Sequence, residues 1–184
     1  ASGLEPDDFG VQLRAMRSEA ELYREANLPL FTASKKLANR YDAIIGAQSV
    51  EWDGEEKTLA QLQPIMLETD RERREAVWRL AAERRLADRD AINVIWQELL
   101  EVRCKIAANA DCTDFREFCW KALQRFDYSP EDCLEFHNAI ADVALPAASR
   151  LLDQRREALD VGDLRPWDLA VDPHGRDPLA PFSE

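Results

Sequence analysis

Residues 125–173 read RFDYSPEDCLEFHNAIADVALPAASRLLDQRREALDVGDLRPWDLAVDP, a stretch with a helix start, a long amphipathic run and an unusual exit. The start runs from Ser129 to Asp132, where a capping hydroxyl is followed by proline at the first helical position and by two acidic residues. These acidic groups face the positive end of the helix dipole. Apolar residues then recur at steps of three and four: Cys133, Phe136, Ile140, Val143 and Ala147. This stretch therefore predicts a long amphipathic helix.

The exit from this helix is predicted to be extended. Pro146 should kink the helix or mark a restart, because proline removes a backbone hydrogen bond and clashes with the preceding turn. After Arg156 the periodicity fades, and four prolines follow: Pro166, Pro173, Pro178 and Pro181. We interpret residues 1–160 as a helical lobe and residues 161–184 as an extended linker that leads toward a further domain.

The N-terminal part is predicted to form two helices. Apolar residues at helical spacing cover residues 5–26, and Asn27 and Pro29 are expected to end that helix. The second helix is predicted over residues 32–46, with Gly46 as its C-terminal stop.

Residues 49–59 predict a short hairpin or a tight loop around Asp53-Gly54, a dipeptide that suits turns. Two capping boxes are expected next, Thr58 with Gln61 and Thr69 with Glu72.

Residues 70–109 are helical in pattern throughout, and the charged residues 88–90 favour a break between two antiparallel helices over one continuous rod. A shorter aromatic helix should then begin at Asp111 or Thr113 and include Leu123.

Composition places the chain in the all-α class, as an antiparallel helical bundle or an elongated helical lobe. It has 184 residues, few glycines, and many residues that favour helices. The net charge of −12 disfavours nucleic acid as a partner. The sequence contains no apolar run of about 20 residues and no signal peptide at its start, so no membrane partner and a cytoplasmic location are expected.

The four cysteines are expected to be reduced and structural. Cys104, Cys112, Cys119 and Cys133 lack the C-x-x-C spacing that places two thiolates on one metal ion. Buried free cysteines behave as small apolar residues and need no further role.

Four blocks of the sequence resemble the oligoendopeptidase F family of metalloproteases, which are related to thimet oligopeptidase. They are residues 41–64 with the turn Trp-Asp-Gly-Glu, the arginine-rich residues 70–93, residues 106–120, and residues 125–173. One departure is Ala110-Asp111-Cys112, which stands where the family usually has glycine and leaves the geometry of that turn open.

The resemblance implies a zinc-dependent hydrolase of two helical lobes, in which short peptides enter a channel between the lobes. This chain would then be a fragment, the N-terminal portion of such a peptidase, and the remainder of its polypeptide would be its partner. The family takes its metal from a His-Glu-x-x-His helix, whereas the two histidines here are His137 and His174. We therefore expect zinc in the parent protein and an inactive chain, and assign no catalytic, cofactor-binding or metal-binding residue.

Several residues have both a structural and a functional interpretation. His137 is interpreted as a hydrogen-bonded structural histidine rather than a ligand. Glu131, Asp132 and Glu135 fit helix capping better than an acid/base cluster.

Trp167 and Asp168 could line a channel, but the structural alternative is that Trp167 anchors the exit against the helices while Asp168 accepts amide hydrogen bonds. The arginines Arg71, Arg73, Arg74, Arg84, Arg85 and Arg89 could bind an anion, but they have acidic neighbours at Asp70, Glu72, Glu75, Glu83 and Asp88. Ion pairs on the helix surface are therefore the favoured use.

Two other functions remain as alternatives. The first is a stand-alone helical protein-interaction module without catalysis. The second, a metal-binding bundle of the carboxylate type, would need Glu-x-x-His motifs that the sequence lacks. If a catalytic lobe normally covers some helix faces, the chain should expose apolar patches and self-associate.

Overall fold

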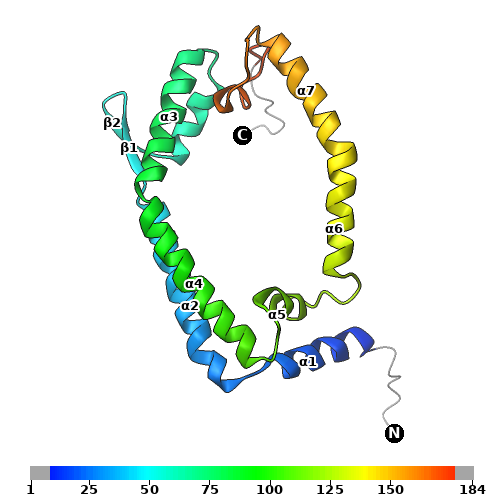
Figure 1. Ribbon diagram of the computed structural model, residues 1–184. Helices are drawn as coiled ribbons and strands as arrows, with labels where there is room; N and C mark the ends of the chain where they lie inside the picture. Colours follow the sequence, from blue (N-terminus) through cyan, green and yellow to red (C-terminus); the bar gives the residue numbers. More distant parts are fainter. Residues whose placement is uncertain (1–8, 177–184) are drawn as a thin grey trace. The chain divides into compact units, whose positions relative to one another are not determined.

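The computed structural model describes residues 9–176. These residues form helices and one two-stranded antiparallel sheet, which confirms the all-α fold (Figure 1). The elements in chain order are α1 (Gly10–Leu22), η2 (Glu25–Asn27), α2 (Leu28–Gly46), β1 (Ser49–Trp52), β2 (Glu55–Thr58), η3 (Ala60–Leu67), α3 (Arg71–Ala87), α4 (Arg89–Asn109), α5 (Phe115–Ala122), α6 (Pro130–Ala139), η4 (Ile140–Ala144), α7 (Leu145–Ala158) and η5 (Pro166–Asp168).

The first two helices meet at a different point from the one predicted. Helix α1 ends at Leu22, and the single 3-10 turn η2 separates it from α2. Pro29 does not end a helix but lies in the first turn of α2, where a missing N–H costs no hydrogen bond. The predicted end of α2 at Gly46 is confirmed.

The hairpin at residues 49–59 is confirmed. Its strands pair from Ser49 opposite Thr58 to Trp52 opposite Glu55. The two turn residues, Asp53 and Gly54, have φ angles of 52° and 78°, the left-handed values that a tight two-residue turn requires.

One of the two predicted capping boxes is present. The Thr58 amide donates to Oε1 of Gln61 at 2.8 Å, and the Gln61 amide donates to Oγ1 of Thr58 at 3.4 Å. Helix α3 is capped differently, because Oδ1 of Asp70, rather than Thr69, accepts from the amides of Glu72 and Arg73. Aspartate is at least as good a cap as threonine, and it is one residue closer to the helix.

A break is present at residues 88–90, since α3 ends at Ala87 and α4 begins at Arg89, whereas the antiparallel arrangement of the two helices stays a prediction. The cap of α5 is Asp114, whose Oδ1 accepts from the Glu117 amide at 2.8 Å, so the start predicted at Asp111 or Thr113 is wrong by one or more residues. Asp111 instead takes a φ of 56°, a left-handed value that aspartate tolerates better than most residues.

Helix α6 begins at Pro130 as predicted. Oγ of Ser129 accepts from the Asp132 amide, and Oδ2 of Asp132 accepts from the Ser129 amide. The helix then passes through one π-helical turn, η4, in which the Leu145 amide donates to the Ile140 carbonyl five residues back. Pro146 follows in the first turn of α7, which confirms the predicted restart.

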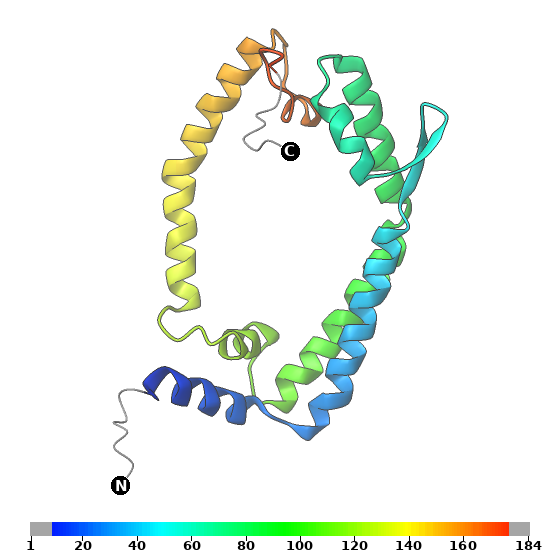
Figure 2. The ribbon, with the colours of Figure 1, turned by 180° about the vertical axis from the view of Figure 1, so that it is seen from behind.

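The chain divides into two compact units. Unit 1 contains the residues up to Ile44 together with Asp90–Leu134, and unit 2 contains Ile45–Arg89 together with the residues from Glu135 onward. In unit 1 the helices α2 and α4 lie side by side (Figure 2). Leu37 packs there with Ile95 and Leu99.

A second apolar cluster of unit 1 joins α1, α4 and α5. Its buried members are Leu22, Ile106, Ala107, Ala110, Cys112 and Phe118. Asn27 is fully buried beside it, where its Nδ2 donates to the Ile106 carbonyl at 3.1 Å and its Oδ1 accepts from Asn109 at 2.8 Å.

The core of unit 2 lies between η3, α3 and the hairpin. Leu62, Ile65 and Val77 are buried, and Val50 and Trp52 of β1 pack against them. This core holds the first turns of α3 in place next to the C-terminal segment described below.

Helices α6 and α7 with η4 contain no buried residue. Their exposed large apolar side chains are Leu134, Phe136, Ile140, Val143, Leu145, Leu151 and Leu152. The spacing of the apolar residues predicted this helix, but it does not identify an element that packs against the apolar face. None of the helices in the described residues is long and apolar enough to cross a membrane.

Candidate functional site

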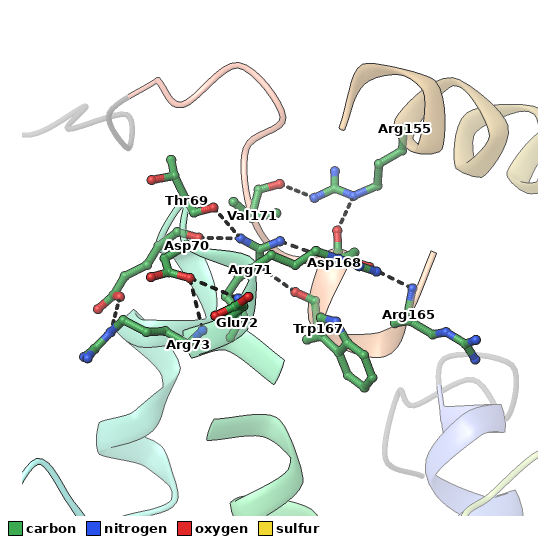
Figure 3. A network of polar contacts seen from close by, with 12 residues as sticks. Thr69, Asp70, Arg71, Glu72, Arg73, Arg155, Arg165, Trp167, Asp168 and Val171 are labelled. Carbon is green, nitrogen blue, oxygen red and sulfur yellow. Dashed lines mark hydrogen bonds and ion pairs between the residues drawn. The ribbon is translucent and has the colours of Figure 1, made fainter. Parts of the chain in front are cut away.

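The candidate site is the carboxylate of Asp168, at the end of the 3-10 turn η5 in unit 2 (Figure 3). The side chain of Asp168 is completely buried. A buried aspartate is unusual unless its charge is paired, and it is therefore a natural place to look for function.

Four donors surround the two oxygens of Asp168. Nε of Arg71 donates to Oδ1 at 3.0 Å and its Nη2 donates to Oδ2 at 2.8 Å. Nη2 of Arg74 donates to Oδ1 at 3.1 Å, and the Arg165 amide donates to Oδ2 at 3.0 Å. The Arg71 contact is the bidentate arrangement that suits a guanidinium and a carboxylate.

The start of α3 positions both arginines. Arg71 and Arg74 are three residues apart, so they share one face of the helix, and the Asp70 cap fixes where that helix begins. Arg74 is almost fully buried. Its guanidinium also donates to the carbonyls of Trp167, Glu68 and Thr69 at 2.8 to 2.9 Å, so its donors are well satisfied.

A third arginine ties the same segment to α7. Nε of Arg155 donates to the Asp168 carbonyl at 2.8 Å, and its Nη2 donates to the Val171 carbonyl (Figure 3). The Trp167 ring packs on Trp78 of α3 with ring centroids 5.4 Å apart, and the Arg79 guanidinium lies 5.2 Å from the Trp167 ring centroid. Residues 165–171 are thus fixed between α3 and α7.

The electrostatics favour a permanently charged group. Burial by itself raises the pKa of Asp168, but the hydrogen bonds from Arg71, the Arg165 amide and Arg74 outweigh it and lower the pKa to about 2. Asp168 is therefore ionised at neutral pH, and its oxygens already accept four hydrogen bonds. Such a carboxylate is suited to anchoring a chain segment rather than to proton transfer.

The structural interpretation of Trp167 and Asp168 is confirmed. Trp167 is buried against α3, and Asp168 accepts an amide hydrogen bond as expected. The sequence did not indicate the partners, because Arg71 and Arg74 lie 97 and 94 positions away from Asp168.

Most arginines of α3 make ion pairs, as predicted, and chiefly with partners outside their helix, whereas Arg85 makes none within the residues that the structure describes. Arg73 pairs with Asp53 and Glu68, whereas Arg84 pairs with Asp88 four residues on, as the spacing suggests. Arg74 is not a surface residue at all. The prediction of ion pairs on the helix surface is therefore wrong for Arg74.

The remaining predicted residues are not brought together. The structural interpretation of His137 is wrong, since it is exposed and makes no hydrogen bond within the residues that the structure describes. Asp132 acts as a cap, and the hydrogen bonds from the Ser129 amide and hydroxyl lower its pKa. The four cysteines are free. Within residues 9–176 no group of three or more His, Cys, Asp or Glu side chains could hold a metal ion.

The sequence matches one family model. Residues 65–174 match the model of peptidase family M3, which is more than half of the chain and includes α3, α4, α6, α7 and the Asp168 segment. A comparison with curated proteins finds no match.

The fold matches solved peptidase structures. A PZ peptidase A bound to an inhibitor is 24% identical, with a TM-score of 0.87 over 95% of this chain. An oligoendopeptidase F from Bacillus anthracis str. Ames is 23% identical, with a TM-score of 0.83 over 90% of this chain. Another oligoendopeptidase F structure is 24% identical, with a TM-score of 0.87 over 92%. The chain spans about a third of each of these structures, between 30% and 32% of their length.

Proposed function

The chain belongs to peptidase family M3, and from this premise we propose that it is the helical, non-catalytic N-terminal portion of a zinc-dependent oligopeptidase. The parent protein would hydrolyse short peptides in the cytoplasm, and the remainder of its polypeptide would supply the metal and the catalytic groups. The observation that carries this proposal is the match of 90% to 95% of this chain to about a third of each peptidase structure.

The residues of this chain do not fit a zinc ion. A zinc peptidase site needs two histidines one helical turn apart, a third ligand and a glutamate that activates water. The histidines here stand 37 positions apart, at 137 and 174, and both are exposed. The proposed role of this chain is therefore to support a site that other residues build.

The Asp168 network supports such a role. It fixes residues 165–171 against α3 by buried contacts, so the path of the chain after α7 is set by the fold. A segment held in this way can present a defined surface to further polypeptide.

A peptidase assay tests the proposal. A quenched fluorescent peptide incubated with the purified chain and zinc should show no hydrolysis, whereas the product of the complete reading frame should cleave it and lose activity with a chelator. Cleavage by this chain alone, abolished by a chelator and restored by zinc, would contradict the proposal.

The exposed apolar side chains of α6, η4 and α7 favour a second candidate, a helical interaction module without catalysis. The two candidates differ in the reading frame after Glu184. The peptidase proposal requires a His-Glu-x-x-His segment there, and the interaction module requires its absence.

Self-association of the isolated chain is expected under either candidate, because apolar helix faces without a partner associate in water. Light scattering should show dimers or larger species at high protein concentration. Replacing Phe136 and Val143, which are 66% and 73% exposed, by serine should shift the chain toward monomer. An unchanged monomer at all concentrations would contradict this expectation.

A further inference from the structure

A concave pocket of about 260 Å³ lies in unit 2 between η3 and α3. Leu62 and Val77, which are almost fully buried, contribute to its apolar lining together with the ring of Trp78. The volume is slightly below that of pockets for drug-sized ligands, and it suits a ligand about as large as one or two amino-acid residues.

The C-terminal segment contributes to the same pocket. Pro166 and Ala170 line it, and they flank the residues that the buried Asp168 carboxylate holds against α3. This part of the lining is therefore fixed by the ion pairs of Asp168 and does not depend on a ligand for its position.

Arg85 and Gln63 are two polar side chains at the pocket without a polar partner among the described residues. Both are exposed, and neither makes a side-chain hydrogen bond or ion pair with another residue in the part of the chain that the structure describes. Other arginines of α3 are paired, as Arg79 is with Glu75 and Arg84 is with Asp88. In a chain of net charge −12, Arg85 therefore places a positive charge without a partner among the described residues beside an apolar pocket.

Helical geometry brings this charge toward the apolar lining. Val77, Ala81 and Arg85 follow each other at steps of four residues, so they lie along one face of α3. Side chains on a helix lean toward its N-terminus, which directs Arg85 back toward Ala81. A ligand could therefore place an apolar group against Val77 and Trp78 and a negative group near Arg85.

We infer that this pocket binds the C-terminal residue of a peptide, with an apolar side chain in the pocket and the free α-carboxylate on Arg85. A guanidinium pairs with a carboxylate through two parallel hydrogen bonds, and the Gln63 amide can donate or accept a further one. The inference rests on the proposed function only in taking short peptides as the ligand class.

Binding of small peptides to the purified chain tests this inference. The probes are Ala-Ala-Leu, the same peptide with an amidated C-terminus, and Ala-Ala-Asp, with binding followed by amide and indole resonances in nuclear magnetic resonance spectra. Ala-Ala-Leu should shift the Trp78 indole signal in a saturable way. Amidation should weaken binding about tenfold, because it removes the charge that faces Arg85, and Ala-Ala-Asp should bind least.

Substitutions identify the site. Arg85→Gln should weaken binding of Ala-Ala-Leu to the level of its amide and leave binding of the amide unchanged. Arg150→Gln, which removes an exposed arginine of α7 that does not line the pocket, should change neither. Arg85 is exposed and unpaired within the described residues, so its replacement should leave the fold intact, as circular dichroism can verify.

Two results would overturn the inference: no saturable shift at Trp78 up to the solubility limit of the peptide, or equal binding of the acid and the amide. Neither result bears on the peptidase proposal, which the hydrolysis assay tests separately. Conversely, hydrolysis by this chain alone would contradict the proposed function and would appear as cleaved peptide in a mass spectrum, without changing the comparison of acid with amide.

Discussion

The two units of the molecule join distant stretches of sequence in different ways. In unit 1, α1, α4 and α5 meet through apolar side chains such as Leu22, Ile106 and Phe118. In unit 2, the segment after α7 joins α3 through a buried carboxylate and the nearly buried Arg74. The difference indicates that ion pairs matter for the fold of unit 2 far more than for that of unit 1.

Exposure explains this difference. Unit 1 also has ion pairs between distant segments, including Arg40 with Glu98 at 2.6 Å, but both side chains are about half exposed. Exposed pairs contribute roughly 0 to 1 kcal/mol, because water and salt screen them and the long side chains lose entropy. Removing one partner of a buried pair costs about 3–5 kcal/mol, because the other charge stays buried without compensation.

Two carboxylates with the same pKa show that a lowered pKa alone does not measure how much a carboxylate contributes to the stability of its unit. The pKa of Glu117 in unit 1 is also lowered to about 2, chiefly by hydrogen bonds from the hydroxyl and amide of Thr113. Glu117 is 37% exposed, whereas Asp168 is fully buried. Solvent screening therefore reduces the contribution of Glu117 to stability, and Asp168 is the carboxylate on which its unit depends.

The largest expected effect is that of Asp168→Asn. The substitution keeps the size of the side chain but leaves Arg74 buried without a countercharge, so unit 2 should lose about 3–5 kcal/mol. Hydrogen exchange of the α3 amides in denaturant measures this loss. Asp163→Asn is the matched control, since that side chain is 81% exposed, and it should be nearly neutral. A loss below about 1 kcal/mol for Asp168→Asn would contradict the proposed dependence of unit 2 on ion pairs.

Ile106→Ala tests the apolar side of the comparison. Ile106 is 1% exposed at the junction of α1, α4 and α5, and truncation of such a residue costs about 2–5 kcal/mol through lost burial and a cavity. Hydrogen exchange of the α4 and α5 amides should report this loss of stability. The size of the loss should not depend on the salt concentration. Val94→Ala, at a site that is 48% exposed, is the control. A loss that varied strongly with salt would count against an apolar junction.

Acid should destabilise unit 2 through Asp168. The pKa of Asp168 is about 2 in the folded chain, whereas its ordinary value is 3.8. As the pH falls, this carboxyl is therefore protonated in the unfolded state before it is protonated in the folded state. The stabilisation, about 2 kcal/mol by proton linkage, is fully present above pH 4 and is lost as the pH falls from about 4 to about 2.

Denaturant unfolding of the wild type and of Asp168→Asn across this range measures the effect. The difference between the two proteins is the relevant quantity, because Glu117 titrates in the same range. The difference should shrink as the pH falls, and a difference independent of pH would refute the assignment.

The smallest expected effect is that of Arg40→Gln, which removes the exposed pair with Glu98 between α2 and α4. We expect a loss of about 0.2–1 kcal/mol that disappears at high salt. Thermal unfolding at low and high salt provides the measurement. A loss comparable to that of Asp168→Asn would erase the contrast between the two units.

Local signals in the sequence predicted much of the fold. The hairpin at Asp53-Gly54, the α6 start at Ser129 and the restart at Pro146 all depend on residues close to each other in the chain. Where two suitable capping residues were adjacent, as at Thr69 and Asp70, the pattern could not choose between them.

The candidate site could not be predicted in the same way. Its ion pairs join residues more than 90 positions apart, and the arginines of α3 look alike in the sequence although Arg74 is buried and Arg85 is exposed. Which arginine is buried depends on how η5 packs against α3, and no local pattern encodes that. The division into residues 1–160 and a linker 161–184 stays a prediction.

The π-helical turn η4 has a consequence for the angular phase of the helix around it. An α-helix advances about 100° per residue, and one π turn accommodates one residue more than an α turn. The side chains after Ala144, such as Leu151, are therefore set back by about 100° from the positions that an unbroken α-helix of the same sequence would give them. Deleting one residue between Ile140 and Ala144 should leave an unbroken α-helix in which Leu151 keeps its angle to Phe136, so the π turn accommodates one additional residue without rotating the apolar side chains that follow it.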